Sequence, residues 1–325
     1  MRARISGTGS FAPPGVMTNA DFEKMVDTSD EWIVSRTGIR ERRIATDDMS
    51  CADMAAEAAR RAMTSAGCTH EDIDLVICGT VTPDYRLPSN ACVLQEMIGF
   101  PNAVAFDVVA ACTGFINGLS IASAYITTGQ SKRALVIGAE KLSSITNYKD
   151  RNTCVLFGDG AGAVILEGSD DGRGVLSTYM RSDGSLRSWL WIEKGGSRHP
   201  YLPGVSEEGS DKILMNGSDV FKVAVRAMGA AASQVIEDAG LTPEDISLFI
   251  PHQANLRIIE AISKRLKLPP EKVYLNIERY GNKSAASVPF ALDEANREGR
   301  LKPGDNVVMV AFGGGMIWGA AAVKW

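Results

Sequence analysis

The chain has 325 residues, of which 45% are hydrophobic and 22% are charged. Such a composition is typical of a globular protein, and the length allows a large core or two packed domains, so a disordered chain is excluded. The net charge of −5 argues against a general nucleic-acid binder, because it leaves no broad positive surface for phosphates.

The first residues, 1–7, include two arginines but no apolar stretch as long as that of a signal peptide. The most apolar segment, residues 307–323, contains four glycines and falls short of the roughly 20 residues that span a bilayer. It is predicted to form a strand, a turn and a second strand. A cytoplasmic protein without a membrane segment is therefore expected.

The first predicted helix covers residues 52–65, where apolar side chains recur at helical spacing. A glycine, a Glu-Asp turn and an apolar strand follow it. The same succession returns with an offset of 173 residues, so that segment 66–77 aligns with 239–250 and segment 134–139 with 307–312. This pattern predicts a duplicated unit.

Each unit alternates short strands rich in Val and Ile with amphipathic helices, which indicates an α/β fold with largely parallel sheets covered on both faces. The expected division is an N-terminal half, 1–170, and a C-terminal half, 171–325, joined by the polar, glycine-rich segment 168–174. We expect the halves to pack in one layered body, with a ligand site near the strand ends where they meet.

Six cysteines lie in the first half, without a Cys-x-x-Cys pair or a histidine at zinc-finger spacing, so no metal site is expected. One of them, Cys112, ends a predicted strand over 104–111 and precedes a predicted helix that opens at Thr113. A helix N-terminus favours thiolate over thiol, so the pKa of Cys112 is expected to be lowered. The alternative is a buried core cysteine. All six are Cys51, Cys68, Cys78, Cys92, Cys112 and Cys154.

The second half places two polar side chains where the duplication would bring them near Cys112. His252 directly follows an apolar strand, and Asn282 lies in the turn whose neighbour Ala285 aligns with Cys112. On its own, His252 could be a core histidine. The two equivalent turns, however, predict a shared centre for all three side chains.

The segments 110–115, 251–255, 281–287 and 312–315, together with 30–40 near the N-terminus, resemble beta-ketoacyl-acyl-carrier-protein synthase III. The similarity runs over nearly the whole chain. It implies the thiolase-like fold, with two duplicated βαβ-type halves packed as a layered αβαβα body, and a homodimer.

The resemblance also implies a reaction and the residues that perform it. Cys112 is the nucleophile that takes the acyl group of acyl-CoA, a short starter such as acetyl-CoA, and His252 and Asn282 stabilise the enolate formed when malonyl-acyl-carrier-protein loses carbon dioxide. Backbone N–H groups of Cys112 and Gly314 hold the tetrahedral oxygen, and Phe312 shields the centre. Acyl-CoA is then a substrate, and no permanent cofactor is expected.

For its two carriers, the resemblance implies that Trp32 stacks on the CoA adenine while Arg36 and Arg151 lie near the phosphates. The acidic carrier protein would bind a basic patch. From the residues alone, these side chains could equally be a core tryptophan and solvated charges. The residues of the patch are Lys222, Arg257, Lys264 and Arg265.

Three features depart from the family pattern. Lys283 stands where a threonine is common, and Leu87 stands where some members carry a phenylalanine that reaches across a homodimer to close the acyl pocket. The segment 186–212 is somewhat long, and nothing in the sequence explains it.

Other functions remain open at this point. A degradative thiolase would need a second cysteine in the C-terminal half, yet the last one is Cys154, and elongating ketosynthases use two histidines. A related Cys-His-Asn synthase of a polyketide or other secondary-metabolite pathway is the main alternative. A catalytically silent acyl-CoA-binding scaffold is the alternative from a different class.

Overall fold

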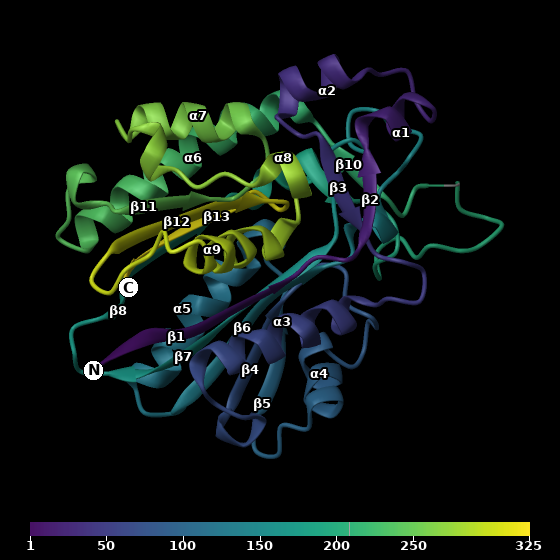
Figure 1. The fold of residues 1–325 in the computed structure, drawn as a ribbon. Helices are drawn as coiled ribbons and strands as arrows, with labels where there is room; N and C mark the ends of the chain where they lie inside the picture. The colour runs from purple at the N-terminus through teal and green to yellow at the C-terminus, as the bar shows by residue number, and fades with distance from the viewer. Residues whose placement is uncertain (208) are drawn as a thin grey trace.

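The computed structural model describes residues 1–207 and 209–325 (Figure 1). Its α-helices are α1 (Asn19–Glu23), α2 (Asp30–Thr37), α3 (Cys51–Ala66), α4 (Asn90–Ile98), α5 (Gly114–Thr127), α6 (Gly217–Asp238), α7 (Leu256–Arg265), α8 (Ile277–Tyr280) and α9 (Ser287–Arg297). Its strands are β1 (Arg2–Phe11), β2 (Gly15–Thr18), β3 (Glu41–Ile44), β4 (Leu75–Gly79), β5 (Val104–Val108), β6 (Arg133–Glu140), β7 (Gly160–Ser169), β8 (Gly174–Ser182), β9 (Leu190–Ile192), β10 (Ile213–Met215), β11 (Leu248–Pro251), β12 (Asn306–Gly313) and β13 (Ile317–Lys324).

Two central sheets organise these elements. One has five strands in the order β1-β7-β6-β4-β5, and the other has four in the order β11-β12-β13-β8. The two short pairs β2-β3 and β9-β10 lie beside them. All strands of the five-stranded sheet precede residue 170, and all strands of the four-stranded sheet follow residue 173. The proposed boundary between the halves, at residues 170 and 171, therefore falls in the link between β7 and β8.

The expectation of largely parallel sheets is wrong. β4 is parallel to β5 and β6, and β11 is parallel to β12, but β7 is antiparallel to both β1 and β6, and β13 is antiparallel to both β12 and β8. A parallel neighbour needs a long crossover, usually a helix. β12 and β13 are instead joined by a glycine-rich turn over residues 314–316, so the strand must return antiparallel.

The layered αβαβα arrangement is confirmed. In Figure 1, α3 and α4 cover the outer face of the five-stranded sheet, α6 and α7 cover the outer face of the four-stranded sheet, and α5 and α9 lie between the two sheets. Each outer helix turns its apolar side inward. The central pair buries residues such as Phe115, Ile116 and Leu292 against both sheets, which makes one continuous core.

The duplication is confirmed at the predicted offset of 173 residues. β6 and β12 match over their full length, and α5 and α9 begin at the equivalent residues Gly114 and Ser287. The short 3₁₀ turns before these helices, Ala111–Thr113 and Ser284–Ala286, are equivalent as well. The edge strand β5 has no strand counterpart, because α8 occupies the corresponding position.

Candidate active site

The two equivalent turns lie against each other in the middle layer. A side chain on Gly114 would place its Cβ 3.2 Å from the Cβ of Ala285, and one on Gly138 would meet the carbonyl oxygen of Ala285 at 2.1 Å. Both glycines are therefore required for the turns to approach so closely. This packing brings the start of α5, with Cys112, next to the start of α9.

Cys112 is almost buried, with 9% of its surface exposed. Burial raises the pKa of Cys112 to about 12, and a hydrogen bond with the Ser284 side chain opposes that change only in part. The expected lowering of its pKa is therefore wrong for the protein without substrate. The helix N-terminus is present, but the second half removes the sulfur from water, and desolvation disfavours the anion.

His252 directly follows β11 and is 1% exposed. Its backbone N–H donates to the carbonyl of Val310 at 2.7 Å, which continues the ladder between β11 and β12. Neither ring nitrogen has a hydrogen-bond partner among the described residues. Burial, assisted by the positive charge of Lys283, lowers the pKa of His252 to about 3. The imidazole is thus neutral near pH 7 and can donate one hydrogen bond into the site.

The local turn fixes the orientation of the Asn282 side chain. Its Oδ1 accepts a hydrogen bond from the backbone N–H of Ser284 at 2.8 Å. Its backbone N–H donates to the carbonyl of Leu156 at 2.9 Å, and its carbonyl accepts from the N–H of Gly158 at 3.0 Å. Because the oxygen of the amide is already held by the turn, the Nδ2 group is the end available to a ligand.

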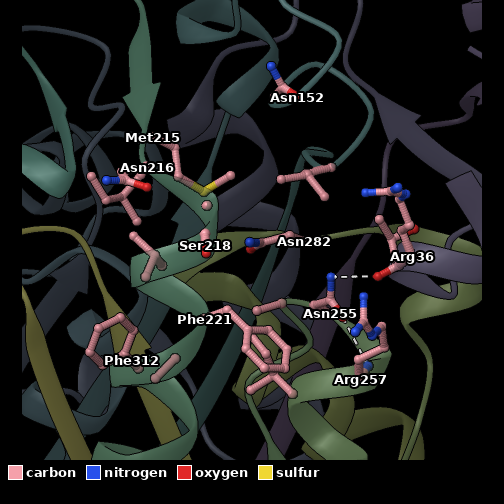
Figure 2. A pocket seen from close by; sticks show the side chains of 18 of the residues that line it. Arg36, Asn152, Met215, Asn216, Ser218, Phe221, Asn255, Arg257, Asn282 and Phe312 are labelled. Carbon is pink, nitrogen blue, oxygen red and sulfur yellow. Dashed lines mark hydrogen bonds between the residues drawn. The ribbon is translucent and has the colours of Figure 1, made fainter.

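One cavity of about 820 Å³ contains all three side chains. Cys112, His252 and Asn282 line it together with Phe312, which comes from the end of β12 and is 5% exposed. Figure 2 shows Asn282 in the middle of this cavity and Phe312 on its apolar side, near Phe221. The structure therefore brings the predicted centre together, while the chemical roles stay predictions.

The three residues predicted to bind CoA also lie together. The guanidinium carbon of Arg36 is 4.7 Å from the centroid of the Trp32 ring, and that of Arg151 is 5.5 Å from it. Trp32 and Arg36, both on α2, line the cavity. Arg151 is outside the lining and donates to the backbone carbonyl of Asp27 at 2.8 Å. Two exposed cations thus flank one half-buried aromatic ring.

The predicted basic patch lies on α6 and α7, and all four of its side chains are exposed. Lys222 and Arg257 line the cavity, and Arg257 also packs over the ring of Phe221 at 5.6 Å. Lys264 and Arg265 are at the far end of α7, outside the lining. The patch therefore extends from the cavity across the surface of α7.

Two predicted residues are not in the lining of this cavity. Leu87 is 88% exposed, on the side of β5. Gly314 follows β12 in the turn, where a side chain would meet the carbonyl of Leu190 at 2.9 Å. The nearest glycine to the nucleophile is Gly313, because its Cβ would lie 2.6 Å from the backbone nitrogen of Cys112.

Several lining residues were not predicted. Asn255 caps α7 by accepting from the N–H of Arg257, and its Nδ2 donates to the carbonyl of Arg36 at 2.9 Å, which ties α7 to α2 (Figure 2). Its place in the Pro-His-Gln-Ala-Asn run was the available signal. The others, which carried no recognisable pattern, include Asn152, Leu190, Met215, Asn216, Ser218 and Phe221.

Leu190 gives the unexplained segment 186–212 a structural role. This segment contains β9, which pairs with β10 and places Leu190 in the cavity wall. Glu208, within the same segment, lies outside the described residues.

Within residues 1–207 and 209–325, no group of three or more His, Cys, Asp or Glu side chains is arranged to hold a metal ion. Of the helices described, none combines the length and apolar character needed to cross a bilayer.

Comparison with known proteins gives consistent matches over the whole chain. Residues 106–184 match the family model "3-oxoacyl-(acyl-carrier-protein) synthase III", and residues 236–325 match the model of its C-terminal region. Beta-ketoacyl-(acyl-carrier-protein) synthase III of Caldanaerobacter subterraneus is 53% identical over 323 residues, which is 99% of this chain and 98% of that relative.

Solved structures agree with these matches. 3-Oxoacyl-(acyl-carrier-protein) synthase III of Aquifex aeolicus superposes with a TM-score of 0.92 at 48% identity, covering 99% of this chain and 100% of that one. A priming beta-ketosynthase of a polyketide biosynthetic pathway superposes with a TM-score of 0.93 at 36% identity, covering 99% of this chain and 95% of that one.

Proposed function

The chain belongs to the 3-oxoacyl-(acyl-carrier-protein) synthase III family, and from this premise we propose that it condenses an acyl group carried on Cys112 with malonyl-acyl-carrier-protein. It is an acyltransferase of the condensing type that initiates fatty acid synthesis, and its fold is thiolase-like. One observation carries the residue assignment, which is the cavity shared by Cys112, His252 and Asn282.

In the first step the Cys112 sulfur attacks the thioester carbonyl of acyl-CoA. A carbon–sulfur bond to Cys112 forms, the bond to CoA breaks, and the thiol proton leaves with CoA as its free thiol. Because burial keeps Cys112 a thiol at neutral pH, loss of the proton has to accompany the attack. The Ser284 hydrogen bond favours that loss, since it stabilises the developing thiolate.

In the second step the malonyl group loses carbon dioxide and leaves an enolate on the carrier thioester. Neutral His252 and the Nδ2 group of Asn282 donate to the enolate oxygen. The enolate carbon then attacks the acyl carbonyl, and the backbone N–H groups of Cys112 and Gly314 hold the tetrahedral oxygen. Collapse releases 3-oxoacyl-acyl-carrier-protein, and the Cys112 thiolate takes up a proton. Phe312 excludes water from this centre.

The carrier of the acyl group is CoA, and its recognition is assigned to α2. The adenine would stack on Trp32 in place of one of the two guanidinium groups, which would then be available for the phosphates. This proposal is supported by the contacts of Arg36 and Arg151 with the same ring.

The second substrate arrives on an acidic carrier protein, for which α6 and α7 offer a complementary surface. Lys222 and Arg257 are close enough to the cavity to guide the carrier's thioester arm into it. Lys264 and Arg265 add positive charge further along α7, which would steer the approach.

We also propose a homodimer that forms along β5. This strand is the edge of the five-stranded sheet, and an exposed apolar edge is a template for pairing with a second strand. Val104 and Val109 are 59% and 78% exposed, and Leu87, beside them in the proposed interface, would reach the partner's acyl pocket. Light scattering of the purified chain, compared with Val104→Asp, tests this assembly.

The preferred starter is a short acyl group such as acetyl, and both steps proceed with acyl-CoA as a substrate and without a resident cofactor. A cytoplasmic location follows from these substrates. The competing proposal, a priming synthase of a polyketide pathway, is supported by the 36% identity with such an enzyme. A panel of acyl-CoA starters assayed with malonyl-acyl-carrier-protein distinguishes the two.

The deciding experiment uses intact-protein mass spectrometry after mixing the chain with acetyl-CoA. We expect one acetyl adduct, its absence in Cys112→Ser, and its retention in Cys92→Ser, which removes a half-buried thiol elsewhere. Addition of malonyl-acyl-carrier-protein should discharge the adduct as 3-oxoacyl product. A chain that binds acetyl-CoA without any adduct would be the silent scaffold.

A further inference from the structure

Lys283 is a fully buried lysine directly after Asn282, with 0% of its surface exposed. Its Nζ has no hydrogen-bond partner among the described residues, and no ion pair involves it there. Burying an ammonium group without such a partner costs several kcal/mol in general, so an ordinary structural role does not account for it.

The surrounding residues form a site for this side chain. Nζ lies 4.5 Å from the centroid of the Tyr280 ring and 4.4 Å from that of Phe290. The two rings are themselves in contact, with centroids 4.7 Å apart. A Cβ on Gly160 would come within 3.1 Å of the Lys283 Cδ, so that glycine leaves room for the lysine stem. Two aromatic faces are the surroundings that stabilise a cation without neutralising it.

The nearest carboxylate does not neutralise the charge either. Glu294, on α9, accepts hydrogen bonds from the Tyr280 hydroxyl at 2.8 Å and from the Asn276 Nδ2 at 2.7 Å, and it pairs with Arg279 at 3.3 Å. Arg279 on α8 and Arg43 on β3 add further positive charge near Lys283. The field of Lys283 reaches His252, whose protonation it opposes.

We propose that Lys283 is a positioning residue for the condensation, because its ammonium, held between Tyr280 and Phe290, adds positive potential behind Asn282 where the malonyl thioester becomes negative. This inference rests on the proposed function. It predicts a selective effect, since the oxyanion of the acylation step is assigned to the backbone N–H groups on the Cys112 side of the cavity. Lys283 also preserves His252 as a neutral donor.

The test compares Lys283→Met, which removes the charge but keeps an unbranched stem, with the unchanged chain. We expect decarboxylation of malonyl-acyl-carrier-protein to fall roughly tenfold, the order of one desolvated cation contact. Acylation by acetyl-CoA should fall less than about twofold on the same scale. Lys283→Thr, the residue common in the family, gives the same comparison if the Met variant does not fold.

Two further readouts separate electrostatics from simple damage to the fold. Burial lowers the pKa of Lys283 to about 7, so decarboxylation by the unchanged chain should decline as the pH rises through that value, and the Met variant should lose this decline. The His252 ring, followed by nuclear magnetic resonance, should protonate at higher pH in Lys283→Met.

Equal losses in both chemical steps, or an unmoved His252 titration together with unchanged decarboxylation, would overturn the inference. The His252 titration does not depend on activity. An unchanged chain that neither acylates nor decarboxylates would therefore contradict the proposed function, while a shifted His252 titration would still support the electrostatic role of Lys283.

Discussion

Ala111 and Ser284 lie 173 residues apart and share a backbone conformation that non-glycine residues rarely adopt, with φ values of 44° and 45°. Each begins the 3₁₀ turn that leads into a central helix, α5 or α9. Such a conformation costs about 1–3 kcal/mol, so the surrounding packing must impose it in both halves. It turns Cys112 into the cavity, and it places the N–H of Ser284 against the Oδ1 of Asn282.

Replacing Ala111 tests this backbone requirement. Ala111→Gly should fold with a stability within about 1 kcal/mol of the unchanged chain, because relief of strain offsets the greater entropy of the unfolded state. Ala111→Val should lose about 1–3 kcal/mol, because a β-branched residue resists positive φ. Urea unfolding measures both variants. Equal stability of the Gly and Val variants would contradict the account.

Asn282 offers a nearly isosteric test of hydrogen-bond donation. Asn282→Ala should cost roughly 3 kcal/mol of transition-state stabilisation in the condensation, the usual size for one such donor. Asn282→Asp keeps the oxygen that accepts from Ser284 but loses the Nδ2 donor, so it should be impaired even though the turn survives. Single-turnover condensation measures both, and an unchanged rate in either variant would exclude the proposed role.

The sequence predicted the duplication and the central constellation because both depend on local signals. The strands β6 and β12, the Glu-Asp turns and the glycines repeat at one offset, and the positions of His252 and Asn282 follow from it. The mixed strand directions were not predictable, since apolar strands buried on both faces read alike whichever way they run.

Other features of the site depend on contacts between distant segments. Leu190 and Asn216 enter the cavity from a region of short strands without a periodic pattern. The pKa of Cys112 was predicted in the wrong direction because the helix start is visible in the sequence, whereas the burial supplied by the second half is not.

That burial gives a testable pH dependence for Cys112. Because burial raises the pKa of the thiol to about 12, the thiolate fraction should keep rising with pH over the whole range from 7 to 10. Alkylation by iodoacetamide without substrate should therefore accelerate about tenfold per pH unit. Peptide mapping identifies the modified thiol. A plateau below pH 8 would indicate a lowered pKa, as the helix N-terminus alone predicts.

His252 should make the folding stability depend on acid pH. Its pKa is lowered to about 3 in the folded chain, against 6.5 as the ordinary value, so between these values the unfolded state binds more protons. The free energy of unfolding contributed by this group therefore rises with pH in that window, by at most about 1.4 kcal/mol per unit. Urea unfolding of the unchanged chain and His252→Asn at pH 4, 5 and 6 isolates this group, and parallel curves would contradict the shift.

Arg257 should matter for the carrier protein and not for the chemistry on CoA. Charge reversal in Arg257→Glu places a negative side chain at the cavity where the acidic carrier is proposed to approach. We expect KM for malonyl-acyl-carrier-protein to rise roughly fivefold, equivalent to about 1 kcal/mol, and the loss to shrink as salt is added. Lys302→Glu is the matched control, because Lys302 is exposed near the start of β12, away from the cavity. If the control weakened carrier binding equally, net charge rather than this surface would determine the interaction.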